Sequence, residues 1–294
     1  MNYPIKFCHI SPTKYLSKYS DYNDAHLILA HLVESDPEYA DFYANLDDGM
    51  YKIMDNSAFE MFKQGRPMYD SSKLIAMGKR CKADCIVMSD YPREDWTKTV
   101  EAGDKMLPDI IDAGFQAFFV PQSKLGDFDG YLQGIEWALD QPIKLIGMSI
   151  LGCPIALGID EKQSIESRSD TYKLQRFLSR FTVFNTMERL GILKDSRAYK
   201  KFHCLGMVDG PNEIDLLKRF SKNIFSWDSS AAIWCGLNGI QFDNSPTGLV
   251  NGKFEKEVDF SFKSGDNNKK IIQRNLDYIN TKIKEWVKNY DLHL

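Results

Sequence analysis

Several features that mark other classes of protein are missing from this sequence of 294 residues. No apolar run reaches the roughly 20 residues that a membrane-spanning helix needs. The opening stretch lacks the basic, apolar and small-residue order of a signal peptide, and the chain contains no internal repeat or low-complexity tract. No glycine fingerprint of the Rossmann type follows a strand-like run. We therefore expect a cytoplasmic protein without a membrane partner, and no open dinucleotide-binding sheet.

Cysteine is sparse and scattered, which bears on disulfides and metals. The chain has six cysteines, at positions 8, 81, 85, 153, 204 and 235. Cys81 and Cys85 are four positions apart, but no second close pair or nearby histidine completes a zinc site. The pattern predicts reduced, buried thiols and no metal centre.

An excess of charge of one sign is also missing. The net charge is −4, with 27% charged and 43% hydrophobic residues. Such a surface does not attract polyanions as a whole, so any contact with nucleic acid would need a local basic patch. The apolar content is sufficient for one substantial core. We expect a single domain over residues 1–294.

Short apolar runs alternate with longer amphipathic stretches along the chain. Seven runs predict strands, at residues 5–10, 50–55, 84–90, 117–122, 144–150, 202–207 and 224–228. Between them, helices are predicted at 70–82, 95–113, 128–139 and 170–190. This alternation predicts a parallel sheet, and seven such units favour a closed (β/α)₈ barrel of the TIM type. The eighth strand is ambiguous and is either residues 239–244 or a segment near the N-terminus.

The last part of the chain departs from this alternation. Residues 244–266 are polar and turn-rich, and they predict a loop or small insertion. Residues 267–290 have the spacing of a long amphipathic helix, which we expect to pack on the outside of the barrel.

Polar residues stand where the predicted strands end. Asp55, Asp90, Gln122 and Asp228 each follow an apolar run. The C-terminal ends of parallel barrel strands share one face, which is where barrel enzymes build their sites. A single aspartate in such a place could instead cap the next helix or form a turn. Three of them with a glutamine, remote in sequence, favour a common site.

The residue types at this face suit a definite chemistry. Two carboxylates facing one pocket fit displacement at a sugar carbon, where one attacks and the other moves protons. A further aspartate and a carboxamide fit recognition of a purine edge, because they combine hydrogen-bond acceptors with a donor.

Six motifs around these residues resemble those of the tRNA-guanine transglycosylase superfamily, in the same order. They are MDNSAFEMF at 54–62, ADCIVMSDYP at 83–92, FFVPQS at 118–123, LIGMSILG at 145–152, FHCLGMVDGPNEI at 202–214 and FSWDSSAAIWCGLNGIQFD at 225–243. The resemblance covers roughly residues 50–243. It implies the same (β/α)₈ barrel that the alternation predicts.

The resemblance also implies a role for each matching residue. Asp228 would be the nucleophile that attacks C1′ of a guanosine and holds the nucleic acid as a glycosyl ester, and Asp55 would be the general acid/base. Asp90 would bind the guanine-like edge of the base and Gln122 its carbonyl. The other substrate-binding positions would be Gly147 and Ser149 through their backbone, Gly206, and Phe59 and Leu205 around the base. Gly236, Asn238 and Gly239 would contact the nucleic acid. Apart from the resemblance, Lys200 and Lys201 belong to a basic cluster before the sixth predicted strand and could contact phosphate. Core packing for Phe59 and Leu205, and a solvated face for the lysines, are the alternatives.

The departures from the superfamily pattern bear on the substrate. No cysteine follows Cys235, so the C-terminal zinc site is missing, and Trp234 and Leu237 replace two arginines of the last motif. This pattern resembles the compact phage-type DNA 7-deazaguanine transglycosylases, which exchange guanine in DNA for a base such as preQ0. The implied partners are DNA and that base, with no cofactor. The location would be the host cytoplasm if a phage encodes the chain.

Other functions stay open at this point. The chain could exchange a base in tRNA through a docking surface without zinc, or serve as a catalytically silent, nucleic-acid-binding partner subunit. A duplex target would have to be opened, since a paired base cannot reach a barrel mouth. An accessory DNA-opening protein is therefore a further candidate partner.

Overall fold

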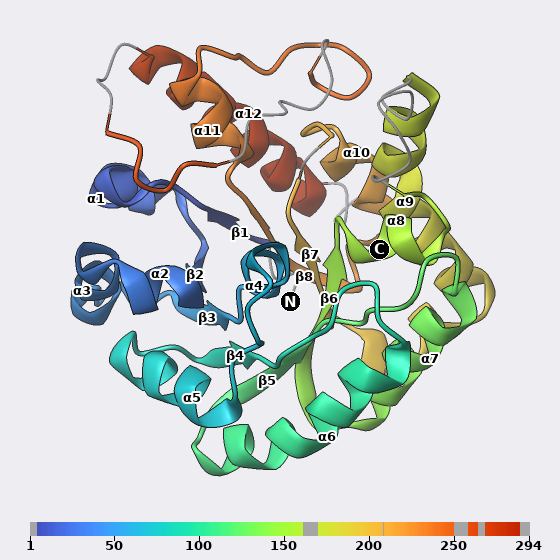
Figure 1. Cartoon of the computed structure of the whole chain (residues 1–294). Helices are drawn as coiled ribbons and strands as arrows, with labels where there is room; N and C mark the ends of the chain where they lie inside the picture. Colours follow the sequence, from blue (N-terminus) through green and yellow to red (C-terminus); the bar gives the residue numbers. More distant parts are fainter. Residues whose placement is uncertain (1–4, 161–169, 208, 250–257, 264–267, 289–294) are drawn as a thin grey trace.

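Eight parallel strands form one sheet that curves into a barrel (Figure 1). The computed structural model describes residues 5–160, 170–207, 209–249, 258–263 and 268–288. The strands are β1 (Lys6–His9), β2 (Ala25–Leu29), β3 (Tyr51–Asp55), β4 (Cys85–Val87), β5 (Gln116–Phe119), β6 (Ile143–Ser149), β7 (Phe202–Leu205) and β8 (Ile224–Ser229). Their order around the sheet is β1-β8-β7-β6-β5-β4-β3-β2, so neighbours in the chain are neighbours in space. The predicted (β/α)₈ barrel is confirmed.

The eighth strand is β2, near the N-terminus. All five residues of its sequence AHLIL are buried. The other candidate, residues 239–244, is wrong, because this segment follows a helix as irregular chain. At the seam between β2 and β1, the Asp24 N–H donates to the Phe7 carbonyl at 2.9 Å. The Phe7 and His9 N–H groups in turn donate to the side chains of Asp24 and Asn23. The turn before β2 therefore helps to close the barrel.

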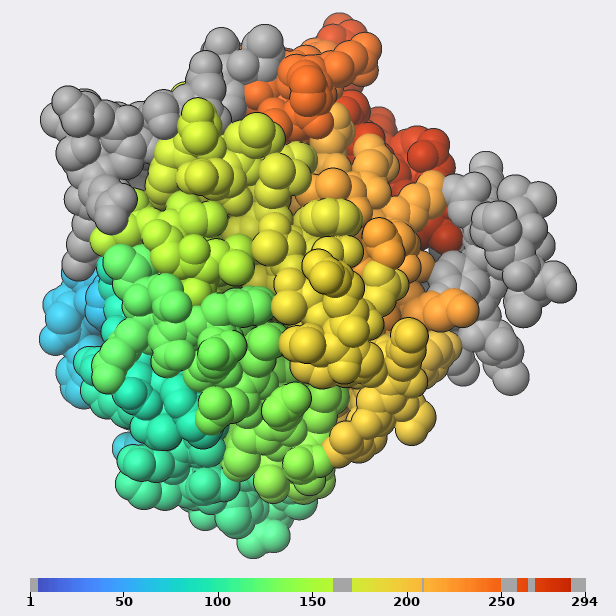
Figure 2. Space-filling view, turned by 90° about the vertical axis from the view of Figure 1, so that its right-hand side faces the viewer, coloured from blue at the N-terminus to red at the C-terminus, as the bar shows by residue number. Residues whose placement is uncertain are grey.

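The predicted helices are confirmed and lie outside the sheet. They are α5 (Ser71–Arg80), α6 (Trp96–Asp112), α7 (Phe128–Asp140) and α9 (Asp170–Arg189). Seen from the side, the segments that carry α6, α7 and α9 follow one another around the barrel (Figure 2). Aspartates at positions 70, 95 and 127 cap the first three, since each carboxylate accepts from an N–H of the first turn. The shorter helices are α1 (Leu16–Tyr19), α2 (Ala30–Ser35), α3 (Pro37–Asn45), α4 (Ala58–Gln64), α8 (Gly152–Ala156), α10 (Glu213–Leu217) and α11 (Ala231–Leu237).

The C-terminal helix α12 (Lys269–Lys288) packs along α11 at one side of the barrel (Figure 1). Its apolar face is buried at Ile272, Leu276, Ile279 and Ile283, as the predicted amphipathic helix requires. Between α11 and α12, the described residues 244–249 and 258–263 contain no helix or strand. None of the helices described is both long and apolar enough to cross a membrane.

Candidate functional site

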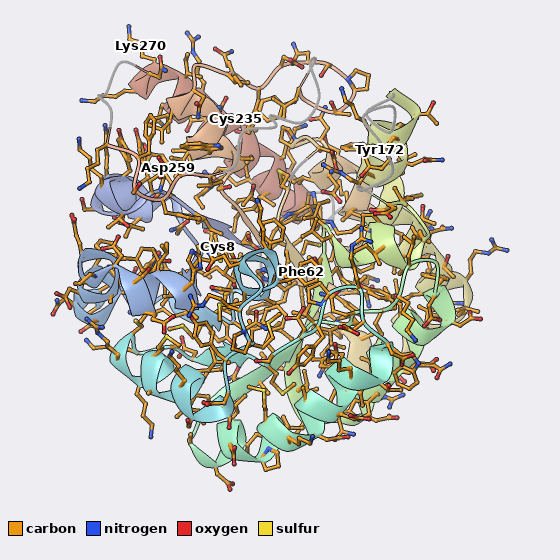
Figure 3. The ribbon with its side chains drawn as sticks, viewed as in Figure 1. Cys8, Phe62, Tyr172, Cys235, Asp259 and Lys270 are labelled. Carbon is orange, nitrogen blue, oxygen red and sulfur yellow. The ribbon has the colours of Figure 1, made fainter. Side chains whose placement is uncertain are left out.

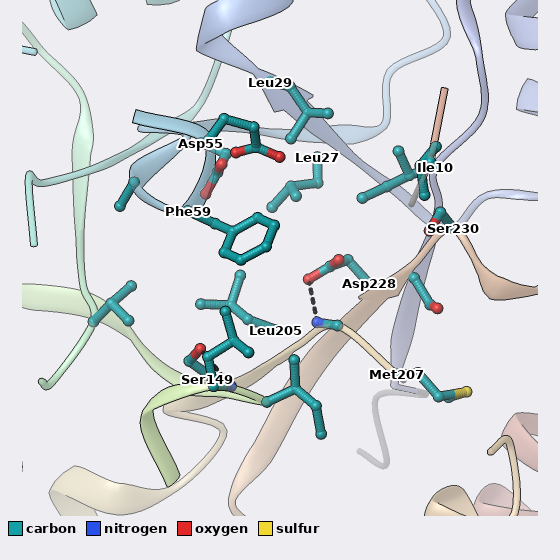
Figure 4. Close-up of a pocket in the computed structure, with 18 of the residues that line it drawn as sticks. Ile10, Leu27, Leu29, Asp55, Phe59, Ser149, Leu205, Met207, Asp228 and Ser230 are labelled. Atoms are coloured by element: carbon teal, nitrogen blue, oxygen red, sulfur yellow. Dashed lines mark hydrogen bonds between the residues drawn. The ribbon is translucent and has the colours of Figure 1, made fainter. Parts of the chain in front are cut away.

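A cavity of about 620 Å³ opens at the C-terminal ends of the strands. Its walls include eight of the predicted site residues: Asp55, Phe59, Asp90, Gln122, Ser149, Leu205, Gly206 and Asp228. Figure 4 shows Asp55, Phe59, Leu205 and Asp228 around one common space. They come from β3, β7 and β8 and from α4, which lies over the barrel opening (Figures 1 and 3). The barrel thus brings together side chains that are up to 173 positions apart in the chain, from 55 to 228.

Asp228 lies in β8 and points into the barrel. Its Oδ1 accepts the Gly206 N–H at 3.2 Å and lies 2.9 Å from His203 Nε2. Because an ionised carboxylate only accepts, His203 Nε2 is then the donor. The other ring nitrogen of His203, Nδ1, lies 2.6 Å from Ser226 Oγ. Ser226 is two residues before Asp228 in β8, so both side chains point to the same side of the sheet. Asp228 is only 5% exposed, yet it reaches the cavity.

Asp55 ends β3 and stands in a different electrostatic setting. Its Oδ2 accepts the Ser57 N–H at 2.9 Å. Burial, followed by the negative charge of Glu60, raises the pKa of Asp55 well above its usual value. Both effects favour the protonated form of Asp55. Ser57 itself has a φ of 54°, and this left-handed residue starts α4 so that the helix turns back over the cavity.

Asp90 and Gln122 form a hydrogen-bonded pair at the ends of β4 and β5. Gln122 Nε2 donates to Asp90 Oδ2 at 2.6 Å, and Asn56 Nδ2 donates to Asp90 Oδ1 at 2.7 Å. Burial raises the pKa of Asp90 to about 6, although both donors oppose the shift. Gln122 Oε1 is buried and has no hydrogen-bond partner among the described residues. Since buried polar atoms are normally paired, this oxygen is an acceptor open to a ligand N–H.

Phe59 and Leu205 were predicted to hold the base between them. Phe59 is 45% exposed, which does not fit core packing, and Leu205 is half-buried. Both side chains reach into the cavity (Figure 4). An apolar ring and a branched aliphatic side chain at a cavity wall can contact the faces of a flat ligand.

Gly147 does not line the cavity. An added Cβ there would lie 2.7 Å from Leu205 Cδ1 and 2.8 Å from the Phe118 ring. The glycine therefore leaves room beside β6 for Leu205, whose side chain lines the cavity. Its predicted backbone contact with the base stays a prediction.

The predicted nucleic-acid positions lie elsewhere. Gly236 permits contact between helices, because an added Cβ would lie 2.5 Å from Ile272 Cγ1 in α12. Asn238 caps α11 through a bond to the Trp234 carbonyl, and Gly239, with a φ of 78°, ends that helix. None of these three positions is part of the cavity wall.

Lys200 and Lys201 lie at the opposite end of the barrel, before β7. Lys200 Nζ donates to the carbonyls of Ser221 and Ile224, at 2.9 and 3.0 Å, and Lys201 Nζ donates to that of Ile143. Ile224 and Ile143 begin β8 and β6, so these ammonium groups close the N-terminal end of the sheet. The structure places neither lysine near the cavity.

Several polar residues at the site were missing from the sequence interpretation, and three of them are ionisable groups next to the carboxylates. Glu60 in α4 lines the cavity, and burial raises its pKa to about 7. His31 in α2 also lines it, and burial lowers its pKa to about 4. His203, the third, supports Asp228 from within β7. A histidine inside the apolar run FHCL was the one available signal, because a buried polar residue needs a partner.

The described residues contain no cluster of three or more His, Cys, Asp or Glu side chains that could hold a metal ion. No model of a known protein family matches the chain, and a search of curated proteins finds no match either. The likeness to the transglycosylases therefore rests on the six sequence motifs. The geometry around Asp55, Asp90 and Asp228 is independent of that likeness.

Proposed function

We propose that this protein exchanges guanine in DNA for a 7-deazaguanine base such as preQ0, through a covalent bond between Asp228 and C1′ of the nucleotide. One observation carries the proposal. Two carboxyl groups face a single cavity in different surroundings, since burial raises the pKa of Asp55 well above its usual value while Asp228 accepts two N–H donors. A proton donor and a nucleophile are what displacement at a sugar carbon requires.

The exchange consists of two balanced displacements. In the first, an Asp228 oxygen bonds to C1′ as the C1′–N9 bond breaks, and the departing guanine takes the proton of Asp55. In the second, the incoming base returns its N9 proton to Asp55, bonds to C1′ through N9 and releases the Asp228 carboxylate. Asp55 thus ends in its starting state, and no cofactor or outside proton source is needed.

Asp90 and Gln122 support recognition of the base. The carboxylate of Asp90 suits the N–H groups of a guanine-like edge. Gln122 Nε2 already donates to Asp90 and is not available for a carbonyl of the base. The open Oε1 of Gln122 instead accepts an N–H of the base. This differs from the role that the family resemblance implies for Gln122.

The test is incorporation of a radiolabelled 7-deazaguanine base. The protein is incubated with the base and either guanine-containing DNA, as single strand and as duplex, or tRNA at the same salt concentration. We expect label in DNA, with single-stranded DNA the better substrate because its bases are already unpaired. Label in tRNA alone would reject DNA in favour of tRNA exchange. No label in any acceptor would favour a silent, nucleic-acid-binding subunit.

A further inference from the structure

The two oxygens of Asp228 have unlike surroundings. Oδ1 accepts from both His203 Nε2 and the Gly206 N–H, whereas no hydrogen bond from a described residue reaches Oδ2. We propose that His203 is a positioning residue that fixes this carboxylate so that Oδ2 is the oxygen that bonds to C1′. This inference rests on the proposed function, because it assigns an atom in that reaction.

His203 is well built for this task. Its side chain is 0% exposed and is not part of the cavity wall, so it cannot touch a substrate. It shares the barrel interior with Ser226 and Asp228, since His203 pairs with Ser226 in the β7–β8 register. The Phe118 ring contacts it edge-on, with ring centroids 5.3 Å apart. The ring therefore has little freedom to turn away from Asp228.

Ser226 sets which nitrogen of His203 carries the proton. Its Oγ lies 2.6 Å from Nδ1, and a hydroxyl can donate to that nitrogen. In a neutral ring, this leaves the proton on Nε2, which then donates to Asp228 Oδ1. The order Ser226–His203–Asp228 is a chain of hydrogen bonds that ends on one chosen oxygen.

Arg180 fixes the second donor to Oδ1. The Gly206 N–H belongs to the peptide unit whose carbonyl is that of Leu205, and Arg180 Nη1 donates to this carbonyl at 3.1 Å. In a trans peptide, the N–H and C=O point in opposite directions. The hydrogen bond from Arg180 to the Leu205 carbonyl therefore orients the Gly206 N–H toward Asp228. Arg180 is buried and paired with Glu213, which holds the guanidinium in place.

The arrangement also serves both displacements. When Oδ2 bonds to C1′, Oδ1 becomes the carbonyl oxygen of an ester and keeps its two donors. When the incoming base displaces that ester, the negative charge returns to the carboxylate. Donors already in place then stabilise it without rearrangement.

The test compares variants in the rate of adduct formation with guanine-containing single-stranded DNA, measured in single-turnover mixtures. His203→Phe removes the donor, and we expect a rate about 100-fold lower, as for the loss of one preorganised donor. His203→Gln keeps an N–H and should lie within about tenfold of the wild-type rate. Equilibrium affinity for preQ0 should stay the same in both variants, because His203 does not reach the cavity.

A matched control exists at another buried pair. His26 is 1% exposed, and its Nε2 lies 2.7 Å from Asp48 Oδ2, but His26 is not part of the cavity wall. His26→Phe should lower the melting temperature without slowing adduct formation. Should His203→Phe not fold, Ser226→Ala replaces it, with an expected loss of about threefold as the proton is no longer held on Nε2. A normal rate in the folded variant would overturn the positioning role.

A measurement without turnover separates this inference from the proposed function. In ¹⁵N-labelled protein, the His203 ring should carry its proton on Nε2, and Asp228→Ala should change its ring nitrogen shifts. Wild-type protein that forms no adduct would overturn the proposed function, and the atom assignment with it. A wild-type adduct with an equal rate in His203→Phe would overturn the positioning role alone.

Discussion

The two ends of the barrel differ in the buried charged groups that they contain: carboxyl groups at the C-terminal mouth and lysine ammonium groups at the N-terminal end. At the C-terminal mouth, Asp55, Asp90, Glu60 and Asp228 surround one cavity. Within the described residues, none of these four carboxyl groups forms an ion pair with a lysine or arginine. Burial raises the pKa of three of them, Asp55, Asp90 and Glu60.

At the N-terminal end, three lysine ammonium groups donate hydrogen bonds to backbone carbonyls. Lys52 donates to the Leu46 carbonyl, Lys201 to that of Ile143, and Lys200 to two carbonyls. These contacts close the bottom of the sheet. The carboxyl groups at the mouth have neutral hydrogen-bond donors instead, as Asp90 has in Asn56 and Gln122. Buried carboxyl groups with raised pKa values are typical of active sites, so the mouth is where the chemistry is expected.

The largest effect should follow from a change at the mouth. Asp55→Asn removes the proton donor, and we expect exchange to slow by about 10²- to 10⁴-fold, the usual contribution of general acid/base catalysis. The rate of label incorporation into DNA measures it. The matched control is Asp84→Asn, since Asp84 is a carboxylate just before β4 at the other end of the barrel. Equal rates for the two variants would remove Asp55 from the mechanism.

A smaller effect is expected on binding. Asp90→Asn should raise the dissociation constant of preQ0 by about 10- to 100-fold, because hydrogen bonds to a charged group contribute about 1.5–3 kcal/mol. In the wild type, affinity should fall as the pH drops through about 6, where Asp90 gains a proton. Calorimetric titration at pH 5 and pH 8 checks both. Affinity that is unchanged in the variant and across this range would contradict the role of Asp90.

Removing the charge of Glu60 at the mouth should stabilise the fold. The folded-state pKa of Glu60 is raised from 4.5 to about 7, so its favourable contribution is present below pH 4.5 and is lost as the pH rises through about 7. Glu60→Gln should therefore increase the free energy of unfolding at pH 8 by an amount on the order of 2 kcal/mol, since one pKa unit is worth about 1.4 kcal/mol.

The pH dependence supplies the control for that change. At pH 4.5 and below, the gain should disappear, because the native Glu60 is then neutral. Glu136→Gln, on the exposed face of α7, should leave the unfolding curve unchanged at both pH values. Denaturant unfolding measures all four cases. A Glu60→Gln variant less stable than the wild type at pH 8 would show that the carboxylate is compensated after all.

The smallest effect on function should come from the N-terminal end. Lys200→Met should leave exchange and DNA affinity within about twofold of the wild type, since its ammonium donates to two carbonyls away from the cavity. Its stability should fall by about 1 kcal/mol per lost hydrogen bond. A weaker salt dependence of DNA binding in this variant would restore the phosphate contact that the sequence suggested.

The sequence predicted the mouth well because its signals are local. An apolar run followed by a polar residue marks a strand end, and parallel strands then place Asp55, Asp90, Gln122 and Asp228 on one face. β2 was ambiguous, because its apolar residues continue directly into α2 and give no polar stop. Strand and helix cannot be separated by periodicity in such a run.

The remainder of the site depends on contacts that no local pattern encodes. Glu60 reaches the cavity only because Ser57 adopts a positive φ and turns α4 over the opening. His203 meets Asp228 only through the register of β7 and β8, which shifts at Phe202 and His203. Gly236 was assigned to nucleic acid, but its reason is the close approach of α12, more than 30 positions later in the chain.

The most direct test of the whole account is the covalent bond itself. The protein is mixed with a single-stranded oligodeoxynucleotide that contains one guanine, denatured, and analysed by mass spectrometry with peptide mapping. We predict an adduct equal in mass to the protein plus the oligonucleotide without its guanine base, linked at Asp228 and missing in Asp228→Ala. No adduct, or a linkage at another residue, would contradict the account.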